Sequence, residues 1–394
     1  MNFLQKIKNL IVDLGRFSSS SSLIIDAFYK DLVSKEDQKL FDLAFAKKVD
    51  QAQLDEFLRA WDIEKYGERK SMMLSYLMKT NPQLQFSNYE KPRLEGLLRY
   101  HRFRNLNLIS HYAKVVKALN ENNIFPMILK GGAMKHIRPD LSRAMGDIDI
   151  LVATKSEFLA ACEISKKLGY VFEEFIGDHS VDLHLPNSKE GTIDIHQYVN
   201  LETDYDKTFL QDLFARAKKE KTFGVEAFVP CFEDIVFLGM INLSRNLHHK
   251  TSMGGILYFL FDFKYLTENK ADFDWDLVLQ NIVKTKTHTQ ALLAMKFINK
   301  IAPTMLLESP LKSRIINKEF DQYCDRVMFN HFYFLDLKYQ CKKLKIKDAV
   351  RDCELMKKYL AKKPKYFLLK RVVRKSYILT RIFLILNNKQ LTQS

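Results

Sequence analysis

Glycine and proline are scarce in this sequence, with 13 and 9 among 394 residues, which excludes collagen-like and low-complexity chains. The 5 cysteines follow no C-x-x-C spacing, so we expect reduced thiols rather than a disulfide framework or a zinc site. No run of about eighteen uncharged apolar residues is present, which excludes an ordinary transmembrane helix. Lys6, Lys8 and Asp13 interrupt the apolar stretch that a secretory signal needs. We therefore expect a cytoplasmic protein, soluble or in peripheral contact with a membrane.

Acidic residues are scarce at the C-terminal end. Residues 330–394 contain 17 Lys and Arg but 4 Asp and Glu, so a charge of +13 out of the formal net +15 lies there. In this segment Lys370, Arg374 and Arg381 fall on one helical stripe, opposite apolar residues. Such a basic helix can bind RNA phosphates, lie on an anionic membrane, or pack on the protein with a solvated face. The sequence leaves these three roles open.

Hydrophobic periodicity divides the chain into helical and mixed regions. Apolar residues recur every three or four positions over most of residues 1–120, which predicts helices. Strands and helices alternate between about 124 and 200, with strands predicted at 125–129, 147–152, 170–176 and 192–199 and helices at 133–137 and 155–169. The pattern favours helices again from about 206. We expect an α+β protein with a small mixed-sheet core flanked by helical regions, divided into residues 1–120, 121–205, 206–330 and 331–394.

Two carboxylates stand in the otherwise apolar run "DIDILV". Asp147 and Asp149 share one face of this predicted strand, because successive side chains alternate between faces. Asp194 stands in the same way in the apolar stretch "TIDIHQYV". Unpaired carboxylates on one face repel each other, and burying them is costly. A divalent cation would compensate them, since hard cations prefer carboxylate oxygens.

A glycine turn precedes the paired acids. In "LKGG" a short strand ends at Gly131 and Gly132, and a helix is predicted to open there. Free backbone N–H groups at a helix start can hold phosphate oxygens. The sequence lacks G-x-x-x-x-G-K-(S/T), so we do not expect a P-loop mechanism. Acids and turn together predict metal-assisted phosphoryl chemistry, in which two metals clamp the attacking and leaving oxygens.

These motifs resemble the family of uncharacterised nucleotidyltransferases within the DNA polymerase β-like superfamily. The matching elements are the turn Leu129-Lys130-Gly131, the stretch from Arg143 to Val152, and Asp194 followed by His196. The resemblance covers about residues 124–285. Two departures are that Gly132 replaces a serine common in the superfamily and that Asn242 stands where the family often has a histidine.

The resemblance implies a role for each site residue. Asp147 and Asp149 would bridge two Mg²⁺ ions, with Mn²⁺ as a substitute, and Asp194 would complete the metal site on the acceptor side. Backbone at Gly131 and Gly132 would approach the triphosphate. Lys130 and Arg143 are cations that would neutralise phosphates. His196 would contact the substrate, orient an acid or have a structural role.

The resemblance also implies a reaction. A nucleoside monophosphate would pass from a nucleoside triphosphate, ATP among the candidates, to an acceptor hydroxyl with release of pyrophosphate. The acceptor could be RNA, a protein or a small molecule. The alternative is a catalytically degenerate protein of the same fold that binds nucleotide or RNA without turnover. The sequence leaves the base, the acceptor and the oligomeric state open.

Overall fold

The computed structural model describes one compact part of the chain. The described residues are Tyr29, 33–46, 49–60, 68–139, 144–172, 180–185, 192–199, 207–249, 253–268 and 272–302. Apart from Tyr29 they all belong to one compact unit, Leu32–Lys312. The basic segment after residue 330 and the predicted phosphate ligand Arg143 lie outside the described residues. The division into four regions stays a prediction.

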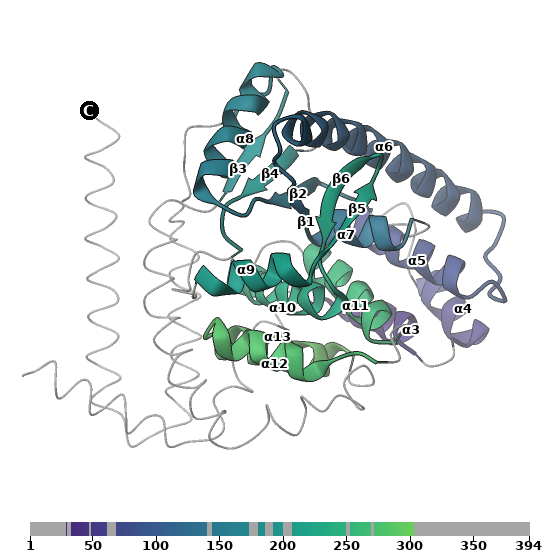
Figure 1. The fold of residues 1–394 in the computed structure, drawn as a ribbon. Helices are drawn as coiled ribbons and strands as arrows, with labels where there is room; N and C mark the ends of the chain where they lie inside the picture. The colour runs from purple at the N-terminus through teal and green to yellow at the C-terminus, as the bar shows by residue number, and fades with distance from the viewer. Residues whose placement is uncertain are drawn as a thin grey trace, which may run out of the picture. The chain divides into compact units, whose positions relative to one another are not determined.

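A six-stranded mixed sheet forms the core, in the order β3-β4-β2-β1-β6-β5 (Figure 1). Strand β2 pairs in parallel with β4 and antiparallel with β1, while β1 pairs in parallel with β6. Strands β3 and β5 form the two edges. The bounds are β1 Met127–Ile128, β2 Asp147–Leu151, β3 Ser180–Leu183, β4 Thr192–His196, β5 Lys218–Thr222 and β6 Val225–Val229. This sheet between helical regions confirms the predicted α+β class.

Two helices cover one face of the sheet. The long helix α6, Glu90–Glu121, contacts β2, β4 and β6, and α8, Lys155–Lys167, contacts β4 and α6 (Figure 1). Thr154 begins α8 with a capping box, in which its side chain accepts from the Glu157 N–H. Ile148 and Ile150 are fully buried. Because side chains alternate along β2, the carboxylates lie on the opposite face, away from α6 and α8.

The remaining helices form the layers around α10. Helix α10 packs against α7, α11, α12 and α13, while α3 contacts α4, α5 and α13 (Figure 1). Their bounds are α3 Lys35–Ala44, α4 Gln51–Ala60, α5 Glu68–Thr80, α7 Lys130–Ile137, α9 Lys207–Arg216, α10 Phe232–His249, α11 Met253–Glu268, α12 Trp275–Lys284 and α13 His288–Ile301.

A buried polar network joins three of these helices. The Asp234 carboxylate on α10 is fully buried and accepts two hydrogen bonds from Arg216 on α9, at 3.1 and 2.8 Å. It also accepts a hydrogen bond of 2.8 Å from Asn281 on α12. Because a buried charge is tolerated only when it is paired and hydrogen-bonded, these contacts fix α10 relative to its neighbours.

The region after residue 206 differs from the expectation of helices alone. Strands β5 and β6 form a hairpin there, and β6 adds it to the sheet beside β1. Phe223 and Gly224 connect the strands with φ values of 49° and 94°, the left-handed conformation that tight hairpin turns require. Of the strand predicted at 170–176, the described part contains a single bridge between Val171 and His184. The predicted strands at 125–129, 147–152 and 192–199 and the helix at 155–169 are confirmed.

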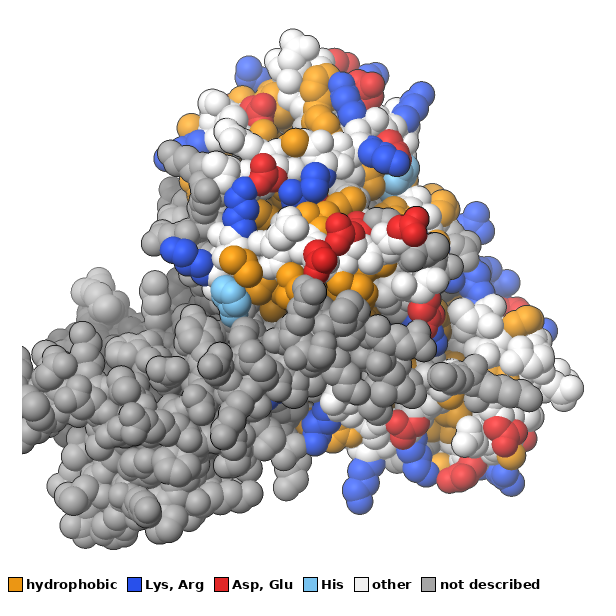
Figure 2. All heavy atoms as spheres, turned by 60° about the horizontal axis from the view of Figure 1, so that its bottom comes forward, with side chains coloured by type: hydrophobic (Ala, Val, Ile, Leu, Met, Phe, Trp, Pro, Cys, Tyr) orange, Lys and Arg blue, Asp and Glu red, His pale blue; other side chains and the backbone are white. Residues whose placement is uncertain are grey.

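Charge is mixed on the surface of the described part. On the face shown in Figure 2, basic and acidic side chains are interspersed with apolar ones. The excess of basic residues lies instead in residues 330–394. Among the described residues, no helix is long and apolar enough to cross a membrane.

Candidate active site

The paired strands β2 and β4 bring the predicted acids together. Asp149 and Asp194 are register partners on these parallel strands, so their side chains lie next to each other. Asp149 is almost completely buried, with 2% of its surface exposed, whereas Asp147 at the start of β2 is exposed. The strand period places Asp147 on the same face as Asp149. The sequence-predicted carboxylates therefore meet on one face of the sheet, on two of its inner strands.

His196 connects the two inner carboxylates. It lies two residues after Asp194 on β4 and is buried. Its Nε2 atom is 2.9 Å from Asp149 Oδ1 and 2.9 Å from Asp194 Oδ2. Burial acts to lower the pKa of His196, but the hydrogen bonds to both carboxylates outweigh it and raise the pKa. His196 thus orients both acids and favours their charged forms.

Lys130 is the second cation at the acids. It is the first residue of α7, where Leu129 in extended conformation precedes it, and its φ of 44° is unusual for a residue other than glycine. The Leu129 N–H donates to the Asp149 carbonyl at 2.9 Å, which ties the start of α7 to β2. The Lys130 ammonium forms an ion pair with the Asp149 carboxylate. Lys130, which the sequence predicts as a cation beside the glycine turn, thus contacts one of the predicted acids.

The acids differ in protonation tendency. Burial would raise the pKa of Asp149, but the charge of Lys130 and the hydrogen bond from His196 hold it below its ordinary value. Burial also acts to raise the pKa of Asp194, and the hydrogen bond and charge of His196 again lower it. The negative charge of Asp149 raises the pKa of Asp147 to about 6. The inner two acids are therefore held as carboxylates by Lys130 and His196.

The donor set fits a divalent cation. Ligand atoms of Asp149, Asp194 and His196 all lie within 4.8 Å of one another. The Asp194 Oδ1 atom is buried and has no hydrogen-bond partner among the described residues. Because an unpaired buried carboxylate oxygen is costly, a cation there would satisfy it. Asp147 lies beside this group at the exposed end of β2.

The two glycines of the turn differ in their surroundings. Gly132 lies in the first turn of α7, and a Cβ atom added to it would come within 2.9 Å of two Ile128 side-chain atoms. It would also lie 3.1 Å from an Ile148 methyl group. A serine at this position would therefore require the Ile128 side chain to shift. Gly131 instead lines a cavity next to the acids.

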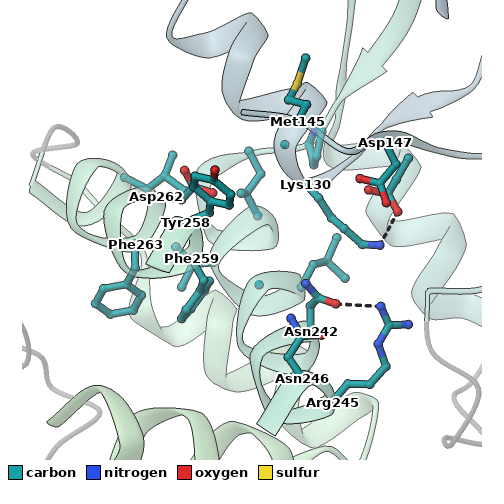
Figure 3. A pocket seen from close by; sticks show the side chains of 18 of the residues that line it. Lys130, Met145, Asp147, Asn242, Arg245, Asn246, Tyr258, Phe259, Asp262 and Phe263 are labelled. Carbon is teal, nitrogen blue, oxygen red and sulfur yellow. Dashed lines mark hydrogen bonds and ion pairs between the residues drawn. The ribbon is translucent and has the colours of Figure 1, made fainter. Parts of the chain in front are cut away.

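This cavity has a volume of about 330 Å³ and lies between the sheet and the helices α10 and α11 (Figure 3). One wall contains Lys130, Gly131, Asp147 and Asp149. The other wall comes from α10 and α11 and includes charged, amide and aromatic side chains, among them Asn242, Arg245, Tyr258, Phe259 and Asp262. Such a concave site with convergent polar groups is typical of small-molecule binding.

Sequence reasoning missed one acid near the site. Asp182 on β3 is the register partner of Asp194, so the carboxylates follow one another across three strands. Burial, followed by the charge of Asp194, raises the pKa of Asp182. The alternation in "SVDL", with Val181 and Leu183 buried and Asp182 exposed, is the pattern that could have indicated it. Four residues are too few for alternation alone to predict a strand.

The chain matches one protein family and is similar to solved structures. A family model described as uncharacterised nucleotidyltransferase matches residues 71–303. The antibiotic-resistance factor ANT(2'')-Ia, known from a solution structure, is similar with a TM-score of 0.35 and 14% identity, over 48% of this chain and 97% of that chain. An H. pylori protein assigned to the nucleotidyltransferases is similar with a TM-score of 0.26 and 13% identity, over 57% of this chain and 93% of that chain. No curated protein matches.

The match to the family model extends over more than half of the chain and includes the acids, the turn and the helices of the cavity. The protein is therefore a nucleotidyltransferase, an enzyme that transfers nucleotide groups. Within that class it belongs to the uncharacterised nucleotidyltransferase family. The predicted resemblance is confirmed.

Proposed function

We propose that this enzyme transfers a nucleoside monophosphate from a nucleoside triphosphate to an acceptor hydroxyl and releases pyrophosphate, with Mg²⁺ as the native cofactor. The observation that supports it is the register pairing of Asp194 with Asp149, which lines a cavity together with the start of α7. Three acids from two strands, next to free helix N–H groups, combine a cation site with a phosphate site.

The acids hold the cofactor. Asp147, Asp149 and Asp194 supply the hard oxygen ligands that two Mg²⁺ or Mn²⁺ ions prefer, while His196 orients two of them by hydrogen bonding. When bound, the cations neutralise phosphate charge and make the acceptor hydroxyl easier to deprotonate. Replacing one of these acids would weaken the cation site but leave the packing of the apolar face of β2 unchanged.

Nucleotide and acceptor approach from different sides. Asp147 and Asp149 are among the described residues that line the cavity, whereas Asp194 is not. The triphosphate therefore occupies the cavity, where the backbone at Gly131 and the Lys130 ammonium contact its oxygens, with Arg143 as a further cation. The acceptor approaches over β4, on the Asp194 side.

The reaction is a displacement at the α-phosphorus. The acceptor oxygen forms a bond to the α-phosphorus as the bond to the bridging oxygen of pyrophosphate breaks. The electron pair of that bond leaves with pyrophosphate, and the hydroxyl proton passes to solvent. The Lys130 ammonium pairs with Asp149. A cation held by Asp149 would compete for that carboxylate and would leave the ammonium available to contact phosphate oxygens.

A screen of four labelled triphosphates tests the proposal. Each nucleotide is incubated with the enzyme, Mg²⁺ or Mn²⁺, and in turn total RNA, cell protein and a small-molecule extract. We expect transfer of label into one of these fractions, release of pyrophosphate, and loss of both with EDTA. The labelled fraction identifies the acceptor class.

Matched variants separate chemistry from folding. Asp149→Asn and Asp194→Asn should each lower the transfer rate about a thousandfold or more, since a shared metal ligand contributes several kcal/mol to the transition state. Asp272→Asn, at an exposed position, is the control and should keep the wild-type rate. Nucleotide binding without transfer of label in any fraction would contradict the proposal and favour the degenerate nucleotide-binding alternative.

A further inference from the structure

The wall of the cavity opposite the acids contains a cation of its own. Arg245 on α10 lines the cavity and is partly buried. Its guanidinium donates a hydrogen bond of 2.8 Å to the side-chain oxygen of Asn242, one turn earlier on the same helix. In Figure 3, Arg245 reaches into the cavity from α10 below, Lys130 and Asp147 come from above, and Asp262 and Tyr258 lie to the left.

Arg245 and Lys130 differ in how their charge is compensated. Lys130 forms an ion pair with Asp149. Among the described residues, no carboxylate lies within ion-pair distance of Arg245, and its hydrogen bond goes to a neutral amide. A partly buried guanidinium that contacts only one neutral acceptor keeps several N–H donors for a ligand. The charge and the donors both favour an anion in the cavity.

The position of Arg245 is fixed by the packing of its helix. Asp234 ties the first turns of α10 to α9 and α12 through hydrogen bonds to Arg216 and Asn281. Near the middle of α10, Gly239 allows the Phe259 ring of α11 to approach so closely that a Cβ atom would lie 2.4 Å from it. Because helix α10 is held at both places, Arg245 is presented to the cavity from a rigid support, as a precise binding group requires.

We propose that Arg245, held in position by Asn242, binds the β- and γ-phosphates of the nucleotide from the α10 wall. The proposal rests on the proposed function, because it takes the cavity as the triphosphate site. The planar guanidinium matches phosphate oxygens in a two-pronged contact, and α7 with Lys130 supplies the opposite wall. Arg245 thereby acts on the part of the nucleotide that leaves as pyrophosphate.

Calorimetry without acceptor tests this assignment. Each of ATP, GTP, CTP and UTP is titrated into the full-length protein with Mg²⁺, and the tightest binder is compared with its monophosphate. Arg245→Ala should weaken triphosphate binding about tenfold to a hundredfold and leave monophosphate binding unchanged. Arg245→Lys keeps the charge but not the fork and should lose part of that affinity. Arg99→Ala removes an exposed arginine of α6 and should bind like wild type.

The second residue is tested by a double-variant cycle. Asn242→Ala should weaken triphosphate binding less than Arg245→Ala does, and it should have no further effect once Arg245 is absent, because it acts through that residue. Thermal unfolding confirms that each variant is folded.

The outcomes separate this inference from the proposed function. Equal losses for triphosphate and monophosphate in Arg245→Ala, or no loss for either, would overturn the inference alone. Wild-type protein that binds none of the four triphosphates would overturn both. A loss confined to the triphosphate would support the inference.

Discussion

Two glycines inside helices are expected to respond in opposite directions to the same substitution. Gly239 in α10 faces the Phe259 ring, two atoms of which would lie 2.4 and 2.5 Å from an added Cβ atom. Gly96 in α6 has no atom within 4 Å of that position. Alanine is favoured over glycine in a helix interior by about 0.5–1 kcal/mol, a gain that both variants share. The difference between them therefore isolates the contact with Phe259.

The size of this difference follows from the packing. Inserting a methyl group into a filled core costs about 1–3 kcal/mol. Gly96→Ala should raise the free energy of unfolding by ~0.5–1 kcal/mol, whereas Gly239→Ala should lower it or leave it unimproved. Since one kcal/mol corresponds to about 2–4 °C in domains of 150–250 residues, the melting temperatures of the two variants should differ by roughly 2–12 °C.

The assay compares the melting temperature and nucleotide affinity of both variants with those of wild type. Because Phe259 lines the cavity, a displaced ring should also weaken nucleotide binding in Gly239→Ala and leave it unchanged in Gly96→Ala. Equal stabilisation of both variants would refute the close approach of α10 and α11 and with it the rigid support inferred for Arg245.

Three further predictions concern the network, a thiol and the basic segment. Asp234→Ala leaves the partly buried Arg216 charge without its partner and should lower the free energy of unfolding, measured in urea, by about 3 kcal/mol or more. Glu56→Ala breaks the exposed ion pair with Lys39 and should lower it by about 1 kcal/mol at most. Burial, and then the charge of Asp234, raises the pKa of Cys231 to about 12, so iodoacetamide at pH 8.5 should modify its peptide far more slowly in folded than in urea-unfolded protein. Because the unfolded thiol titrates near its ordinary pKa of 9.0, the same shift should lower stability as the pH rises above that value, and a flat profile there would contradict it. If RNA is the acceptor, alanine at three basic residues of the C-terminal segment should weaken RNA binding and flatten its salt dependence: Lys370, Arg374 and Lys375. Unchanged binding would exclude this segment as the contact.

The sequence could predict those parts of the site that depend on local periodicity. Alternation in β2 and β4 fixes which side chains share a face, so the sequence pattern suffices to pair Asp147 with Asp149 and Asp194 with His196. The proximity of Asp149 to Asp194 cannot be predicted from a local pattern. It depends on the register of two parallel strands that α8 separates in the sequence. Resemblance to a family, rather than periodicity, predicts that contact.

Other features have little or no local pattern. Strand β5, "KKEKT", has a single buried residue at its end, so no alternation of apolar residues marks it, and the turn at Gly224 is the remaining indication. Arg245 stands in a helix stretch that resembles a solvated face, and its exposure to the cavity depends on how α11 packs. The role of Gly132 as a close contact likewise depends on the Ile128 side chain beneath it.

The parallel pairing of β2 with β4 has a consequence for how the protein is made. Asp149 and Asp194 become neighbours only after β4 has left the ribosome and α8 has crossed the sheet. Contacts between distant parts of a chain form slowly, so we expect this pairing of carboxylates to be completed late in folding. A cation that binds only the finished site stabilises it by about 2.7 kcal/mol at a concentration of 100 times its Kd, but leaves the rate of folding unchanged. A divalent cation bound as proposed would thus stabilise finished molecules without speeding their folding.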